Sequence, residues 1–91
     1  MVIRVHLVSS AADTATQGQI VHGHIMKALQ RDDIAIVSFK DVDTATSSFV
    51  NAAFVPLLRS FSFNEIKRRV RIIDSTRQIN DMIKRRLTRE A

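Results

Sequence analysis

The sequence contains no cysteine, which excludes disulfides, thiolate chemistry and cysteine-bound metals. Only two glycines and one proline are present, too few for a flexible linker or a disordered chain. It also lacks an apolar run long enough to span a membrane, and the strand-like N-terminus, interrupted by Arg4 and His6, lacks the pattern of a signal peptide. We therefore expect one domain over residues 1–91, in the cytoplasm, with no membrane contact.

Charge is unevenly distributed along the chain. The net charge of +5 divides into −1 up to Leu58 and +6 from Arg59 onward. Such a basic region can bind nucleic acid or an acidic protein, or can simply be solvated. The candidate nucleic-acid-binding residues are Lys67, Arg68, Arg69, Arg71, Lys84, Arg85, Arg86 and Arg89. Because the chain has no tyrosine or tryptophan for base stacking and no recognition motif, nucleic-acid binding is the second hypothesis for its function.

Three short segments have the hydrophobic pattern of strands. They are Val2–Ser9, Ile34–Phe39 and Val70–Asp74. The middle one is apolar on both faces except at Ser38, which indicates a central strand. Helical segments separate the strands, and strand-helix-strand units favour parallel pairing with right-handed crossovers. The prediction is an α/β fold, β-α-β-α-β-α, with a mainly parallel three-stranded sheet in the order 1-2-3 and the first two helices on one face.

Three helices are expected from capping signals and apolar stripes. The first begins at a capping box, Thr16–Gln19, and the third at a second box, Ser75–Gln78, with Ser75 as the N-cap. Gly23 inside the first helix suggests close packing there. The second helix is apolar nearly all round from Phe49 to Leu58 and should kink or tighten at Pro56. We expect it to be buried in the chain or shared with a partner, which predicts self-association or a stable complex with another chain. Ser60–Lys67 is expected to be a connection whose phenylalanines fold back onto the core.

The polar cluster between the second strand and the second helix is the strongest candidate for a functional site. Thr46, Ser47 and Ser48 follow the carboxyl end of a buried strand and open a helix, where α/β proteins commonly bind their ligands. The candidate partner-binding residues are Asp43, Thr44, Thr46, Ser47, Ser48 and Asn51. An alternative stays open, since Thr46 or Ser47 can serve merely as the N-cap of the helix.

Catalytic and metal sites have no support in the sequence. His22 and His24 are two residues apart and would not share a helix face. A serine nucleophile elbow and a phosphate-binding glycine loop are both missing. We therefore expect no catalytic residue, no metal and no cofactor, and a protein that is not an enzyme.

One combination of segments resembles a known family. It comprises the strand Ile36–Phe39 with Asp41 and Val42 after it, the helix opening Thr46–Phe49 and the strand Val70–Ile73 with its trailing helix. From Ile34 to Ile83 this pattern resembles the STAS-like domains, small relatives of the STAS domains of anti-anti-sigma factors, which are sigma-factor antagonists. The subgroup with a Ser-Phe helix opening is largely without an assigned biochemical role.

The resemblance implies a regulatory function. In anti-anti-sigma STAS domains, a serine in an Asp-Ser-Ser-Gly motif is phosphorylated by a kinase of the anti-sigma class, and the unphosphorylated form binds that kinase. Ser47 matches the phosphoacceptor, while Thr46 replaces the aspartate and Phe49 the glycine. The implied function is a non-enzymatic partner-switching module with an anti-sigma-type kinase as partner. A phosphate on Ser47 would add about −1.5 to −2 charges.

Overall fold

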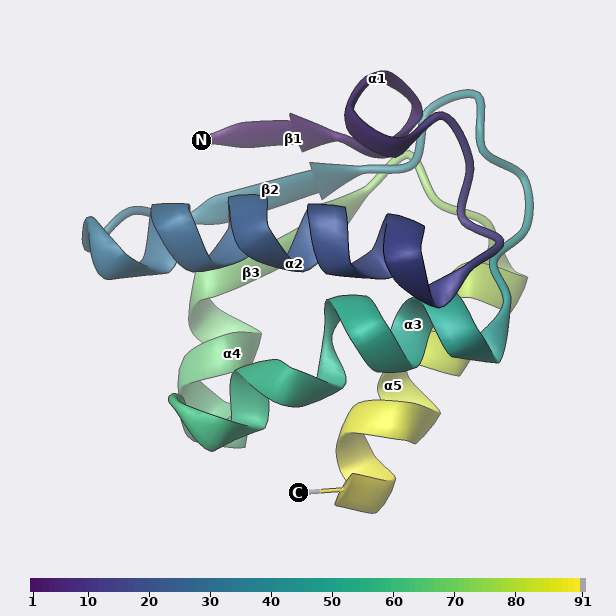
Figure 1. Cartoon of the computed structure of the whole chain (residues 1–91). Coiled ribbons are helices and arrows are strands. Elements are labelled where there is room, and N and C mark those ends of the chain that lie inside the picture. The colour runs from purple at the N-terminus through teal and green to yellow at the C-terminus, as the bar shows by residue number, and fades with distance from the viewer. Residues whose placement is uncertain (91) are drawn as a thin grey trace.

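A three-stranded parallel sheet is the frame of the fold (Figure 1). The computed structural model describes residues 1–90. Its elements in chain order are β1 (Val2–Arg4), α1 (Val5–Ser9), α2 (Ala15–Gln30), β2 (Ala35–Ser38), α3 (Ser47–Ala53), the 3₁₀ helix η1 (Val55–Arg59), α4 (Phe63–Arg69), β3 (Val70–Ile73) and α5 (Arg77–Glu90). The strands are ordered β1-β2-β3 and both pairs are parallel, which confirms the predicted α/β class and strand order.

The register of the sheet separates a core face from an open face. Ile3 lies opposite Val37, and Val37 opposite Ile72, so these side chains share the face that the helices cover. Val2 and Arg71 lie on the other face and are exposed. Figure 1 shows α2 and α3 on the same side of the sheet, and both predictions, the shared face and the central, most buried β2, are confirmed.

The segment after β1 differs from the prediction, because Val5–Ser9 forms the short helix α1. The Oγ of Ser9 lies 3.0 Å from the carbonyl oxygens of both Val5 and Ala11, so its single hydrogen can be donated to either one; the contact with Val5 spans one helical turn. Val5 and Ser9 are the buried residues of this turn, while Leu7 is 71% exposed. Ile3 and Val5 would be buried whether this segment continued as a strand or turned into a helix. Alternation over so few residues therefore could not distinguish the two.

The N-caps of α2 and α5 are shifted from the predicted residues. Thr14, not Thr16, caps α2: its Oγ1 accepts from the N–H of Gln17, whose side chain accepts from the N–H of Thr14, both at 3.1 Å. At α5, Thr76 rather than Ser75 accepts from the N–H of Ile79, at 3.3 Å. Both predictions were wrong by one or two residues because a nearby threonine hydroxyl is the cap in each case: Thr14 with Gln17 forms an equivalent box, whereas at α5 the side chain of Gln78 is bonded to Ala45 instead of to the cap.

Close helix packing occurs at Gly18, not at Gly23. A Cβ atom on Gly18 would collide with the carbonyl oxygen of Phe49 and lie 2.8 Å from Cβ of Ala52. Gly18 therefore lets α2 approach the backbone of α3. Gly23 is exposed, with open space where its side chain would be, so the predicted packing reason for it was wrong.

Helix α3 is buried within the chain, and the backbone tightens to a 3₁₀ helix around Pro56, as predicted. Phe49, Val50 and Ala53 are buried, and a 3₁₀ helix containing Pro56 follows. None of the large hydrophobic residues exposed among residues 1–90 lies on α3. Self-association was predicted from the apolar surface of this helix, but that surface is buried within the chain. Self-association itself stays a prediction.

The expected connection from Ser60 to Lys67 contains the start of α4, so that prediction was wrong in part. Ser62 caps α4 by accepting from the N–H of Glu65 at 3.2 Å, and this Ser-x-x-Glu spacing is a helix signal. Phe61 and Phe63 do pack against the core, as predicted.

In residues 1–90 no helix has both the length and the apolar character to cross a bilayer.

Candidate functional site

The opening of α3 is fixed to the loop that precedes α2. Thr46 is the N-cap: its Oγ1 accepts from the N–H of Phe49 at 3.2 Å. The same hydroxyl donates to the carbonyl of Asp13 at 2.7 Å, and the N–H of Thr46 donates to the carbonyl of Ala12 at 3.0 Å. Thr46 therefore caps the helix and joins two loops, which settles the capping alternative in favour of Thr46 over Ser47.

Helix α5 holds the other side of the same loop. The side chain of Gln78 accepts from the N–H of Ala45 at 3.2 Å and donates to the carbonyl of Ala45 at 3.1 Å. The hydroxyl of Thr76 donates to the carbonyl of Asp43 at 3.1 Å. The segment from Asp43 to Thr46 is thus held on one side by backbone carbonyls of the loop before α2 and on the other by the side chains of Thr76 and Gln78. A surface fixed in this way loses little conformational entropy when a partner binds.

Ser47, Ser48 and Asn51 occupy the outward side of α3. Ser48 and Asn51 are exposed and Ser47 is half-buried, while Phe49 and Val50 face the core. The helical spacing of three and four residues places these three polar side chains on one side. Asp43, Thr44 and Thr46 are exposed on the loop just before them. The structure therefore brings the six candidate residues together at the start of α3, and the serine hydroxyls are not used for capping.

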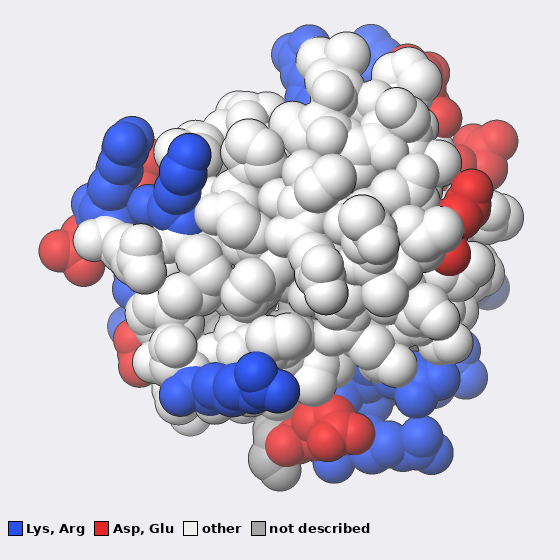
Figure 2. Space-filling model, viewed as in Figure 1, with Lys and Arg blue, Asp and Glu red and all other residues white. Residues whose placement is uncertain are grey.

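An uncharged surface extends from this opening across α2. Figure 2 shows the face formed by α2 and α3 as largely free of Lys, Arg, Asp and Glu, with charged side chains around its border. Lys27 is the charged residue of α2, and α3 has none. We define the α2–α3 face by exposed or half-exposed residues of both helices: Thr16, Gln19, Ile20, Gly23, Ser47, Ser48 and Asn51.

The α2–α3 face was missed in the sequence, although a signal for it existed. Residues 14–26 and 44–58 contain no charged side chain, in a chain in which a quarter of the residues are charged. We used the composition of the second segment only to predict burial. Depletion of charge is also typical of the centre of a protein interface. His22 contributes to the rigidity of this face, since its Nδ1 lies 3.2 Å from the carbonyl oxygen of Ala53.

The candidate basic residues are spread over α4, β3 and α5. Arg69 donates to the carbonyl of Leu29 at 2.6 Å and its guanidinium lies 5.5 Å from the ring centre of Phe61, so it joins elements within the fold. Arg71 lies on the open face of the sheet. Nucleic-acid binding by these residues stays a prediction.

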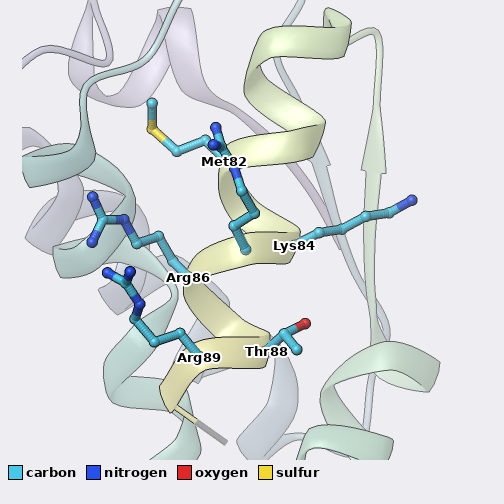
Figure 3. Close-up of a pocket in the computed structure, with 6 residues that line it drawn as sticks. Met82, Lys84, Arg86, Thr88 and Arg89 are labelled. Atoms are coloured by element: carbon cyan, nitrogen blue, oxygen red, sulfur yellow. The ribbon is translucent and has the colours of Figure 1, made fainter.

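Side chains of α5 surround a surface hollow of about 510 Å³. They are Met82, Lys84, Arg85, Arg86, Thr88 and Arg89. In Figure 3, Lys84 extends to one side of α5, whereas Arg86 and Arg89 extend together to the other. The hollow therefore does not direct all its cations at one point. Elsewhere too, residues 1–90 contain no group of three or more histidine or acidic side chains placed to hold a metal ion.

These features define a small α/β domain in which a rigid, capped helix opening follows the central strand of a parallel sheet. A family model described as a STAS-like domain of unknown function (DUF4325) matches residues 17–80, and the chain belongs to this family. The match begins in α2, upstream of the Ile34–Ile83 stretch on which the resemblance was based. No curated protein and no solved structure gave a significant match.

Proposed function

We propose that this domain is a non-enzymatic, cytoplasmic protein-interaction module whose partner binds the α2–α3 face together with the opening of α3. The observation that carries the proposal is the near absence of charge from this face in a chain of which a quarter of the residues are charged. Removing charged groups from water is costly, and a neutral polar surface avoids that cost when a partner covers it. The clamped loop adds rigidity at the margin of the face.

The proposal includes regulation at Ser47. A phosphate there would place about −1.5 to −2 charges at the margin of a neutral surface. A partner that covers the surface would then have to desolvate that charge, which weakens binding. Because Thr46 provides the cap, modification of Ser47 would leave the capping hydrogen bond in place. In this proposal the partner is a kinase of the anti-sigma class, as the STAS relationship suggests.

The replacement of the glycine in the Asp-Ser-Ser-Gly motif by Phe49 does not alter the proposed binding surface. Phe49, in place of glycine, is completely buried and packs edge-on against Phe39 with ring centres 6.3 Å apart. It therefore belongs to the core and leaves the outer surface of α3 to Ser47, Ser48 and Asn51. Binding at this surface does not require that Ser47 is phosphorylated in the cell.

The test is an affinity capture from the native host with matched variants, followed by titration of each recovered partner. Ser47→Asp should weaken partner binding by about tenfold or more, which is roughly 1.4 kcal/mol. Ser47→Ala should bind like wild type. Ser60→Asp, which adds the same charge at an exposed residue after η1, is the control and should also bind like wild type.

Two results distinguish the parts of this proposal. If Ser47→Asp binds every recovered partner as tightly as wild type, the opening of α3 is not a partner surface. Mass spectrometry of the protein from its host decides whether Ser47 carries phosphate. An unmodified Ser47 with a binding defect in Ser47→Asp would retain the interaction and remove the kinase step.

Nucleic-acid binding remains the alternative function and makes a distinct prediction. Each phosphate neutralised by Lys or Arg releases counterions, so binding must weaken steeply as salt concentration rises. A mobility-shift assay with duplex and single-stranded oligonucleotides at low salt tests this alternative. The absence of any shift would eliminate it.

A further inference from the structure

An open apolar groove lies between β3 and the helices α4 and α5. Its volume is about 430 Å³, within the range of binding pockets. The apolar side chains that line it include Phe63, Ile66, Val70, Ile72, Ile83 and Leu87. Two exposed lysines, Lys67 of α4 and Lys84 of α5, line it as well. Figure 3 shows Lys84 extending from α5 on the side where β3 lies.

The groove adjoins a free edge of the sheet. β3 is the last strand in the order, and the carbonyl of Ile73 accepts from the N–H of Phe39 at 3.0 Å. Successive residues of a strand direct their backbone groups to opposite sides, so the N–H and C=O of Ile72 point away from β2. The N–H of Val70 is bonded to the carbonyl of Ile66, which sets the start of the free edge. The unpaired backbone N–H and C=O groups at the edge of β3 therefore lie beside the apolar groove.

Charge determines which occupant suits this edge. Lys67 and Lys84 line the groove, and Arg71 is exposed on the opposite face of β3. A second copy that paired its own β3 here would bring the two sets of cations together, and like charges across paired strands are destabilising. An added strand with acidic side chains would instead be attracted by these cations on both faces of β3.

We propose that the β3 edge binds an extended acidic segment of another protein as a fourth strand. Alternate apolar side chains of the segment enter the groove, and the acidic side chains between them lie on the face of Arg71. Its flanking carboxylates pair with Lys67 and Lys84. The groove uses β3, α4 and α5, so this site is separate from the α2–α3 face and does not depend on the proposed function.

The first test uses a labelled synthetic peptide, Glu-Glu-Val-Asp-Ile-Glu-Val-Asp-Asp, in an anisotropy titration with the full chain; its first and last residues lie on the same face as its apolar residues, where the two lysines are. Two further peptides are N-methylated, one at the amides of the three apolar residues and the other at the amides of the three acidic residues that directly precede them. Because a strand pairs through every second residue, only one of the two should lose binding, by about tenfold or more. The unmethylated peptide, when bound, should also slow hydrogen exchange at the amide of Ile72. No binding, equal effects of the two methylation patterns, or unchanged exchange at Ile72 would each overturn the proposal.

The second test separates the groove from the overall charge. The double variant Lys67→Glu/Lys84→Glu should weaken peptide binding by about tenfold or more. The control Arg68→Glu/Arg85→Glu makes the same charge change on the same two helices, at residues that do not line the groove. It should change affinity by less than about threefold, since successive side chains on a helix do not share a face and the interactions of exposed charges are weakened by physiological salt. Equal losses in both double variants would contradict a site in the groove.

Discussion

The α2–α3 face and the groove beside β3 are parts of one small domain, yet they differ in both packing and charge. α2 and α3 are so close that Gly18 has no room for a side chain. By contrast, β3 and α5 leave a groove of about 430 Å³. The charge follows the same division, because α2 and α3 together contain a single charged residue, Lys27, whereas Lys67 and Lys84 line the groove.

The two proposals assign a different type of recognition to each region. A rigid neutral surface selects its partner by shape and hydrogen bonding, and a single added charge is enough to disturb it. A basic groove beside a free strand edge suits an anionic extended segment, and its affinity depends on salt. Under the two proposals, the domain would bind two different protein surfaces at sites that do not overlap.

The largest expected difference between the two regions concerns the cost of deleting an isoleucine. Ile25 of α2 is fully buried, whereas Ile72 is partly exposed in the groove. Ile25→Ala should lower the free energy of unfolding by about 3 kcal/mol, since it leaves a cavity in a closely packed core. Ile72→Ala should cost only about 1 kcal/mol, because less apolar area is lost and the groove is already open. Urea unfolding of both variants measures the difference, and equal costs would mean that the groove is closed in solution.

The next effect concerns the two glycines of α2, for which we expect opposite signs. Gly18→Ala forces a methyl group against the Phe49 carbonyl and should destabilise the protein by about 1–3 kcal/mol. Gly23→Ala adds a methyl group in open space and should stabilise the helix by about 0.5–1 kcal/mol. The unfolding midpoints of the two variants should therefore lie on either side of the wild-type value. A neutral Gly18→Ala would show that α2 and α3 are not in close contact.

The sheet could be predicted from sequence because its signals are local. The run Ile34–Phe39 is apolar at every position except Ser38, a pattern typical of the central strand of a parallel sheet. Helix starts were less predictable, since adjacent Ser and Thr residues offer competing caps. At α5 the side chain of Gln78 is engaged with Ala45, a contact between residues 33 apart that no local pattern contains. For Val5–Ser9, five residues are too few to separate the period of a helix from that of a strand.

Of the candidate surfaces, the opening of α3 was predictable because its residues are contiguous in the sequence. The α2–α3 face depends on the packing of two helices, and only the missing charges in each segment indicated it. The groove depends on where α5 lies relative to β3, which hydrophobic periodicity does not determine. No local pattern in the sequence indicated that Arg69 donates a hydrogen bond to the carbonyl of Leu29. Long-range contacts therefore account for most of what was missed.

The smallest effect distinguishes the structural hydroxyl from the proposed functional one at the edge of the α2–α3 face. Thr46→Ala removes both the N-cap of α3 and the hydrogen bond to Asp13, so it should lower the free energy of unfolding by about 1–2 kcal/mol. Ser47→Ala should change stability by less than about 0.5 kcal/mol, because the Ser47 hydroxyl does not cap the helix. Thermal unfolding of the two variants gives the comparison directly. A loss at Ser47 as large as that at Thr46 would mean that Ser47 is a structural residue, and a binding defect in Ser47→Asp would then no longer identify a partner surface.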